Sequence, residues 1–377
     1  MSIHNGRAAF RAICAGVVLA GLTAAGGPAS AGPPPPLDLR EALDEAVAAG
    51  NPGVLAYARQ GASQWRLAAG VADRGTGRPA RPGDHWRIFS NTKSFVSTVV
   101  LQLAGEGRLS LDDTVDRWLP GLVRGHGNDG KRITLRQLLN HTSGLYDPTN
   151  DPAFYTDEGG VSPREIVRAA LAHPPTFPPG QGWDYSNTNY LLVGRVIEAV
   201  TRRRPDVEIQ RRILIPLGLT QTTFPRQGGR LPEPHLHGYD LAYRDVTGFD
   251  PVGEWTAGAM VSTVADLARF DAALFGGRLL RPAEQKALLT TVPGHGYGLG
   301  VQRGSVPCDH TARPVWQTDG GGPGFNSISL TSLDTSRQLV LVATVFDLAD
   351  NQRFPDRPAF PDASAAFRTA VDSVFCS

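Results

Sequence analysis

Ser90 and Lys93 are the two residues whose types and spacing point most directly to chemistry. They stand three positions apart in Ser90-Asn91-Thr92-Lys93, directly after a short apolar segment. Apolar residues then recur with helical spacing, so Ser90 is predicted on the first turn of an amphipathic helix, with Lys93 one turn along the same face. A lysine amine in this position can take the proton of the serine hydroxyl and make its oxygen a nucleophile.

The composition of the chain favours a chemical role for this lysine. The sequence has 37 lysines and arginines, and three of them are lysines: Lys93, Lys131 and Lys286. Arginine stays protonated in proteins, whereas a buried lysine can lose its proton and act as a base. The alternative interpretation is a solvated surface lysine, because Ser-x-x-Lys also arises by chance. A helix start at Ser90 adds a second argument, since its free N–H can stabilise an oxyanion.

The Tyr185-Ser186-Asn187 segment is a second candidate group, in a loop ahead of a helix predicted over residues 189–201. A lysine ammonium that meets a tyrosine hydroxyl favours the phenolate, so Tyr185 is expected to pass a proton to the leaving group. The Asn187 amide is expected to hold a substrate carbonyl. The structural alternative is a tyrosine packed on the next helix and an asparagine that caps it.

The third candidate group is the glycine-rich stretch Thr318-Asp319-Gly320-Gly321, which follows a strand predicted over residues 315–317. Glycine permits close approach, so a substrate could pair with this strand, and the N–H of Gly321 could be a second oxyanion donor beside that of Ser90. Side chains alternate along a strand, so Asp319 is expected to point opposite to Thr318, behind the sheet. The alternative is a glycine-rich hairpin without a ligand.

The elements that must position these residues follow from the hydrophobic pattern. Helices are predicted over 38–48, 135–139, 189–201, 262–275 and 362–375, and a capping box at Ser162 opens another. Strands are predicted over 54–59, 64–73, 297–302, 315–317, 326–330 and 338–346. The simplest arrangement is an α+β fold, an α/β sandwich in which one antiparallel sheet has helices on its faces. Its α/β part is expected over about 38–90 and 255–377, with a mainly helical insertion over about 91–254.

The N-terminal residues have the pattern of a signal peptide. Arg7 and Arg11 precede an apolar run, and this run is followed by Ala29-Ser30-Ala31, a small-x-small cleavage pattern. Residues 1–31 are therefore predicted to be removed. Residues 32–37 form a Pro-rich spacer. The product is expected to be secreted, extracellular or periplasmic, without a stable membrane anchor. In an oxidising compartment Cys308 and Cys376 are expected to form a disulfide, although two separate buried thiols remain an alternative.

The motifs together resemble those of the penicillin-recognising serine hydrolases, in the branch with class C β-lactamases and D-alanyl-D-alanine carboxypeptidases. Ser90-x-x-Lys93 is similar to the nucleophile motif, and Tyr185-Ser186-Asn187 to the Tyr-x-Asn motif. Thr318-Asp319-Gly320 stands where that branch has Lys-Thr-Gly or His-x-Gly. Residues 138–145 and 258–270 resemble two further family stretches, so the resemblance covers most of the chain.

The resemblance implies a β-lactamase/transpeptidase-like fold and a role for each matching residue. The implied roles are as follows: Ser90 as the acylated nucleophile, Lys93 and Tyr185 for proton transfer, Asn187, Thr318 and Gly320 for substrate binding, and the N–H groups of Ser90 and Gly321 for the oxyanion hole. Thr318 replaces the lysine or histidine of the family. Substrates with a free terminal carboxylate are therefore expected to bind about tenfold more weakly.

The leading functional hypothesis is an exported serine hydrolase that forms an acyl-enzyme on Ser90, most simply a D-alanyl-D-alanine carboxypeptidase-like enzyme acting on small peptides such as peptidoglycan stem peptides. An esterase or a β-lactamase of the same family is the near alternative. A β-lactam- or peptidoglycan-binding protein with weakened turnover is another. An α/β-hydrolase is disfavoured because the sequence has no Gly-x-Ser-x-Gly elbow.

Other classes of function find little support in the sequence. The net charge of +1 and the single basic run at Arg202-Arg203-Arg204 do not indicate a nucleic-acid partner. No metal or other cofactor is implied, because His235 and His237 are more typical of surface histidines than of ligands. The protein is expected to be a monomer.

Overall fold

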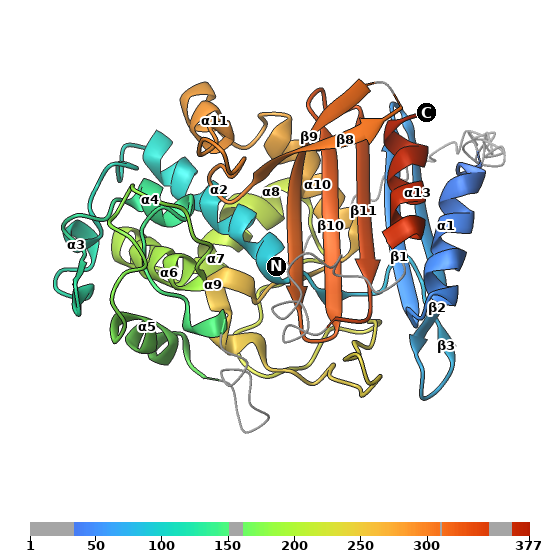
Figure 1. Cartoon of the computed structure of the whole chain (residues 1–377), viewed down its shortest axis with the longest axis horizontal. Helices are drawn as coiled ribbons and strands as arrows, with labels where there is room; N and C mark the ends of the chain where they lie inside the picture. Colours follow the sequence, from blue (N-terminus) through green and yellow to red (C-terminus); the bar gives the residue numbers. More distant parts are fainter. Residues whose placement is uncertain (1–33, 151–160, 310, 347–363) are drawn as a thin grey trace, which may run out of the picture. The chain divides into compact units, whose positions relative to one another are not determined.

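One antiparallel sheet receives strands from both ends of the chain, as predicted (Figure 1). The computed structural model describes residues 34–150, 161–309, 311–346 and 364–377, so the expected signal peptide at 1–31 lies outside the described residues. The strand order is β3-β2-β1-β11-β10-β9-β8. Its strands are β1 (Gly53–Gln60), β2 (Ser63–Asp73), β3 (Arg78–Pro79), β8 (Gln302–Cys308), β9 (Thr311–Gly322), β10 (Phe325–Ser332) and β11 (Arg337–Ala343).

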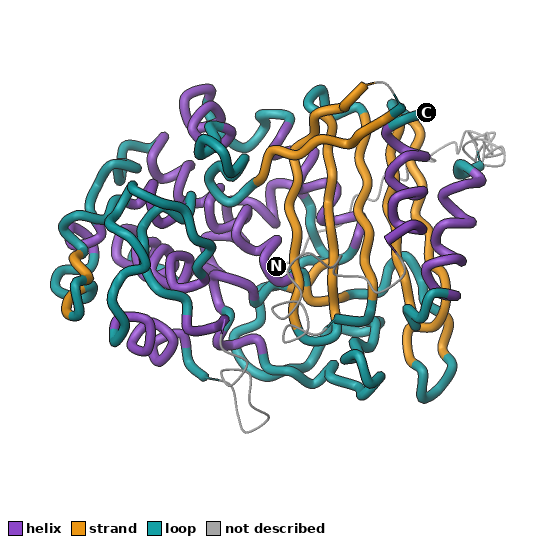
Figure 2. Tube along the Cα trace, viewed as in Figure 1, coloured by secondary structure: helices purple, strands orange, loops and turns teal. Residues whose placement is uncertain are grey.

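The two faces of the sheet are buried in two separate cores. Along β1, Val54, Ala56 and Ala58 belong to one core, and Leu55 and Tyr57 to the other, as expected for side chains that alternate along a strand. Helices α1 (Leu37–Ala48) and α13 (Ser364–Phe375) cover the first face, and α10 (Val264–Phe275) packs on the second (Figure 2). The predicted α+β fold is therefore confirmed.

The segment between the two sets of strands is mainly helical and holds the elements around Ser90. Two short two-stranded pairs accompany it, β4 (Trp86–Arg87) with β7 (Val261–Ser262) and β5 (Arg124–Gly125) with β6 (Asn128–Asp129). The helices of this part and of the segment before β8 are η1 (Phe89–Asn91), α2 (Thr92–Gly105), α3 (Val115–Trp118), α4 (Leu135–Leu139), η2 (Pro148–Asn150), α5 (Pro163–Leu171), α6 (Asn187–Thr201), α7 (Pro205–Ile209), η4 (Gln210–Leu214), α8 (Ile215–Leu217), η5 (Pro251–Gly253), α9 (Trp255–Gly258) and α11 (Pro282–Leu289). Among the described residues, no helix combines the length and apolar character needed to cross a membrane.

One predicted strand is wrong. Residues 297–302 form a bend in which Tyr297 makes a single bridge to Gln302, and β8 begins only at Gln302. Gly300 has φ +80° and lies so close to α2 that a Cβ would be 2.4 Å from Ser97 Oγ. Only glycine fits this backbone conformation and this close approach to α2. The sequence pattern of residues 297–302 therefore predicted a strand that the chain does not form.

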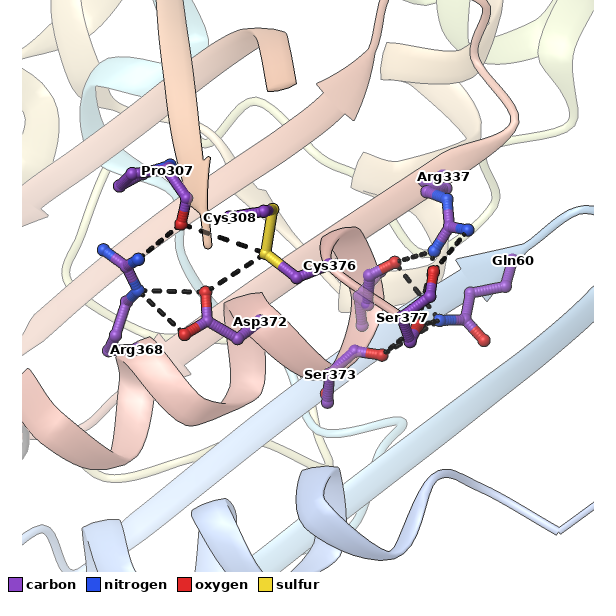
Figure 3. Close-up of a disulfide and its surroundings, with 10 residues drawn as sticks. Gln60, Pro307, Cys308, Arg337, Arg368, Asp372, Ser373, Cys376 and Ser377 are labelled. Carbon is purple, nitrogen blue, oxygen red and sulfur yellow. Dashed lines mark hydrogen bonds and ion pairs between the residues drawn. A yellow bond between two sulfur atoms is a disulfide. The ribbon is translucent and has the colours of Figure 1, made fainter. Parts of the chain in front are cut away.

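A disulfide joins Cys308 to Cys376, the pair expected from the sequence (Figure 3). It connects the end of β8 to the residue that follows α13. Arg368 on α13 adds an ion pair with Asp372 and a hydrogen bond to the Pro307 carbonyl. The disulfide and the hydrogen bond to Pro307 hold α13 against β8, the strand next to β9.

Candidate active site

The turn that carries Ser90 is held between β4 and β9. Ile88 donates its N–H to the Met260 carbonyl at 3.0 Å, which continues the β4–β7 pairing up to the turn. Phe89 has φ +40°, a left-handed conformation that is costly for a residue with a side chain. Its buried ring lies where a Cβ on Gly322 would be, so packing against β9 maintains this conformation. Ser90 therefore stands on a fixed 3₁₀ turn directly before α2.

Lys93 lies on the first turn of α2 and is buried, with 1% of its surface exposed. Its Nζ lies 2.9 Å from Ser90 Oγ, 2.7 Å from Asn187 Oδ1 and 2.8 Å from the Ala257 carbonyl oxygen. Burial lowers the pKa of Lys93 from 10.5 to about 8. An uncharged amine has two N–H groups and one lone pair. The two carbonyl oxygens can take the N–H groups, which leaves the lone pair for the proton of Ser90.

Tyr185 approaches the same serine from the loop before α6. Its hydroxyl donates to Ser90 Oγ at 2.8 Å. Burial raises the pKa of Tyr185 well above 10, more than the hydrogen bond to Ser90 lowers it. Lys93 Nζ lies over the tyrosine ring, 4.8 Å from its centroid, and no hydrogen bond joins it to the hydroxyl. These contacts and the raised pKa favour a protonated Tyr185 in the resting structure over the lysine-stabilised phenolate expected from the sequence.

Asn187 begins α6 and positions Lys93. The amine must donate to the amide oxygen, which turns the amide nitrogen toward Thr149, where it donates to Oγ1 at 2.9 Å. The backbone N–H of Asn187 donates to Asp147 Oδ2 at 2.8 Å. We predicted that this amide would hold a substrate carbonyl. In the structure both ends of the amide are bonded within the protein, to Lys93 and Thr149, so Asn187 orients the amine. The substrate contact stays a prediction.

A buried histidine, His141, packs against the ring of Tyr185. His141 Nδ1 accepts the backbone N–H of Ser186 at 3.1 Å, and Nε2 lies 3.2 Å from the Tyr297 hydroxyl. Burial, aided by the Lys93 charge, lowers the pKa of His141 well below 6.5, so the ring is neutral. It packs on the Tyr185 ring with centroids 4.4 Å apart. The sequence placed His141 in a family-like stretch but did not indicate this contact.

Strand β9 lies against the Ser90 turn because of Gly320. A Cβ on Gly320 would be 2.1 Å from the Ile88 carbonyl oxygen and 2.7 Å from Asn91 Nδ2. Any side chain at this position would push β9 away from the Ser90 turn. The structure therefore shows a packing role for Gly320, and the substrate-binding role expected from the sequence stays a prediction. Strand β8 pairs with β9 only as far as Gln302 and Gln317, so residues 318–322 have no strand on their outer edge. Gly321, the predicted oxyanion donor, lies on this open edge.

Thr318 and Asp319 point to opposite faces of β9, as predicted, and Asp319 is the exposed one of the two. Thr318 is 4% exposed, and its hydroxyl lies in the core without a hydrogen-bond partner among the described residues. It is paired across the sheet with Ser329, whose hydroxyl is bonded to Asp271 on α10. The burial of its hydroxyl argues against the substrate contact expected from the sequence, which stays a prediction. Asp319, which we expected behind the sheet, is exposed, and its charge acts on Lys93 and Tyr185.

The charges around Lys93 are all acidic. Glu254, Asp147 and Asp319 each favour the ammonium form of Lys93, although burial has the larger effect. Asp147 is buried and bonded to Thr149 and Asn187, and its pKa is raised mainly by burial. These three carboxylates come from three separate loops and strands, so no local sequence pattern could have grouped them.

Comparison with known proteins identifies the family. A family model described as Beta-lactamase matches residues 39–360. The chain belongs to the beta-lactamase family. It is a serine hydrolase of the beta-lactamase fold, which confirms the family and fold expected from the motifs.

Several relatives resemble the chain over most of its length. The structure of a D-stereospecific amidohydrolase from Streptomyces sp. is 37% identical, with a TM-score of 0.78, and covers 91% of this chain and 99% of that one. The D-amino acid amidase from Ochrobactrum anthropi SV3, solved with L-phenylalanine amide, is 27% identical, with a TM-score of 0.76, and covers 89% and 97%. The penicillin-binding protein homologue PbpX from Bacillus subtilis (strain 168) is 27% identical over 296 residues, which are 78% of this chain and 70% of PbpX.

Proposed function

We propose that the protein is an exported amidohydrolase that cleaves D-amino acid amides, or short peptides with a D-residue at the cleaved bond, through an acyl-enzyme on Ser90. The observation that carries this proposal is the position of Ser90 Oγ, 2.9 Å from the Lys93 amine and 2.8 Å from the Tyr185 hydroxyl. The amide and D-configured substrate class is supported by the Streptomyces and Ochrobactrum relatives. Export is supported by the signal-like residues 1–31 and by a disulfide that requires an oxidising compartment.

The proposed reaction follows from the donors and acceptors of the site. The neutral amine of Lys93 takes the proton of Ser90, and Oγ attacks the amide carbonyl carbon. The N–H groups of Ser90 and Gly321 are proposed to stabilise the oxyanion. Tyr185, protonated in the resting enzyme, gives its proton to the leaving nitrogen as the C–N bond breaks. It regains a proton from the water that attacks the acyl-enzyme, and Lys93 returns its proton to Ser90 Oγ as the ester bond breaks. Water then hydrolyses the ester on Ser90.

D-Alanyl-D-alanine carboxypeptidase action is the second candidate, supported by the motifs and by the similarity to PbpX. Such a substrate carries a carboxylate on its leaving group. The charged groups that act on Lys93 are carboxylates, with no arginine among them, so the surroundings oppose a second anion. This charge balance favours a neutral amide over a carboxylate-terminated peptide. Esterase and β-lactamase activities use the same acyl-enzyme and remain lesser alternatives, as does a binding protein with weakened turnover.

The test compares four substrates with the mature protein: D-phenylalanine amide, L-phenylalanine amide, a peptide ending in D-alanyl-D-alanine, and a penicillin. We expect the highest kcat/KM for D-phenylalanine amide and no turnover of any substrate by Ser90→Ala. A higher kcat/KM for the D-alanyl-D-alanine peptide would support the second candidate. A covalent adduct with penicillin without steady turnover of any substrate would support a binding protein.

A further inference from the structure

Asp319 is an exposed carboxylate that the catalytic steps do not use. It lies on the open edge of β9, two residues before Gly321 and on the same face of the strand. Gln302 donates to its Oδ1 at 3.0 Å, and Gln317 in turn donates to the Gln302 side-chain oxygen at 3.0 Å. This chain of amides fixes the direction of the carboxylate. Its Oδ2 has no hydrogen-bond partner within the described part of the chain.

No cation of the described protein neutralises Asp319 by an ion pair. Arg313 is on the same strand but six residues away, which is about 20 Å at 3.3 Å per residue. Although the Asp319 side chain is exposed, the surrounding protein partly desolvates it and so raises its pKa, and the charge of Lys93 opposes this rise. The Lys93 amine itself is bonded to Ser90, Asn187 and Ala257. The carboxylate is therefore free to bind a cation from outside.

The spacing along β9 fits an amino acid derivative. Asp319 and Gly321 are separated by about 7 Å along the strand, and a carboxylate extends a few ångströms from its backbone. A substrate whose carbonyl oxygen points to the N–H of Gly321 lies along the same edge of β9, with its α-nitrogen two bonds from the carbonyl carbon. In the binding mode proposed below, that nitrogen is oriented toward Asp319. A free α-ammonium group is the cation that an amino acid amide brings to this place.

We propose that the Asp319 carboxylate binds the free α-ammonium group of the acyl part of the substrate. This inference rests on the proposed function, since it concerns the amide whose acyl group is transferred to Ser90. Asp319 thereby restricts the enzyme to amino acid amides and peptides with an unblocked amino end, and excludes N-acylated substrates. Replacing the ion pair by a neutral hydrogen bond lowers the rate for a free-amine substrate about tenfold.

The test uses two covalent probes, the diphenyl phosphonate analogues of D-phenylalanine with the amino group free and acetylated. The rate at which each labels Ser90 is measured in wild type, in Asp319→Asn and in the matched surface control Asp112→Asn, which loses only the ion pair between an exposed carboxylate and Arg136. We expect wild type and Asp112→Asn to prefer the free amine about tenfold, and Asp319→Asn to label equally with both probes.

The outcomes separate this inference from the proposed function. Equal labelling by both probes in wild type, or an unchanged preference in Asp319→Asn, overturns the role of Asp319 while leaving Ser90 as the nucleophile. Failure of both probes to modify Ser90 in wild type overturns the proposed function and this inference with it. Normal labelling by the acetylated probe in Asp319→Asn shows that the variant is folded, so the loss is confined to amine recognition.

Discussion

Asn187 Oδ1 lies 2.7 Å from Lys93 Nζ and is one of two fixed acceptors that hold the amine beside Ser90. The other is the Ala257 carbonyl oxygen at 2.8 Å. With both bonded, a neutral amine directs its lone pair at the serine hydroxyl. The low pKa of Lys93, about 8, makes this neutral form accessible in mildly alkaline water.

Asn187→Asp should move the pH dependence of acylation to higher pH. A carboxylate beside the amine favours the ammonium form, so the pKa of Lys93 should rise above its present value of about 8. The labelling rate of Ser90 in wild type should rise with pH and level off above about 8, and in the variant it should level off later. Thr149→Val serves as a control that adds no charge: it removes the hydrogen bond from the asparagine amide and the one that the Thr149 hydroxyl donates to Asp147. The same pH profile in all three proteins would contradict this role for Asn187.

Gly320→Ala should inactivate the enzyme by displacing β9. A Cβ would be 2.1 Å from the Ile88 carbonyl oxygen, so the strand must move away from the Ser90 turn. A misplacement of about 1 Å costs on the order of 100-fold in rate. Gly83→Ala is the matched control, since a Cβ there meets nothing within 4 Å. Steady-state kinetics with wild-type rates in Gly320→Ala would show that the close approach is not required.

Asp271→Asn should stabilise the protein at alkaline pH. Burial raises the pKa of Asp271 from 3.8 to about 7, and the hydrogen bond from Ser329 only partly opposes this. Because the folded-state pKa is raised, the aspartic acid favours folding below pH 3.8, and this contribution is lost as pH rises through 7. Asparagine cannot ionise, so the variant avoids the free-energy cost of an ionised carboxylate in the core. That cost is a few kcal/mol, at about 1.4 kcal/mol per pKa unit. Thermal melts should show a higher Tm for the variant at pH 8 and no gain at pH 4. An equal Tm difference at both values would refute the assignment.

Breaking the Cys308–Cys376 disulfide should lower stability but not abolish acylation. The closed loop has a sequence separation of 68, for which the chain-entropy model gives about 4 kcal/mol. The bond ties β8 to α13, which packs in a different core from α2, the helix that carries Lys93. Urea unfolding of Cys308→Ser/Cys376→Ser, compared with wild type, measures the loss. Two free thiols in unfolded, non-reduced wild type would show that the bond does not form.

The residues nearest the chemistry could be predicted from the sequence because local periodicity determines where they lie. A three-residue spacing on a helix brings Lys93 to Ser90 wherever that helix lies, and the structure has this contact at 2.9 Å. The face of β9 could not be predicted in the same way. Alternation separates Thr318 from Asp319, but only the packing of β9 on η1 and α10 decides which of them is buried.

The supporting groups depend on contacts between distant parts of the chain. Asp147 and Tyr297 reach the site from two loops and Ala257 from α9, and none of them belongs to a recurring motif. The bend at residues 297–302 likewise depends on how closely Gly300 lies to α2. Sequence periodicity carries no information on such contacts, which is why the predicted strand there was wrong.

The central claim is that Ser90 is acylated with Lys93 as its base. The most direct measurement is peptide mapping by mass spectrometry of enzyme quenched in acid during turnover of a D-phenylalanine ester, in wild type and in Lys93→Arg, which keeps the charge but cannot act as a base. We predict the mass of one D-phenylalanyl group on the peptide that contains Ser90 in wild type, and no such mass in Lys93→Arg. An acyl group on another residue, or equal acylation of Ser90 in Lys93→Arg, would contradict the account.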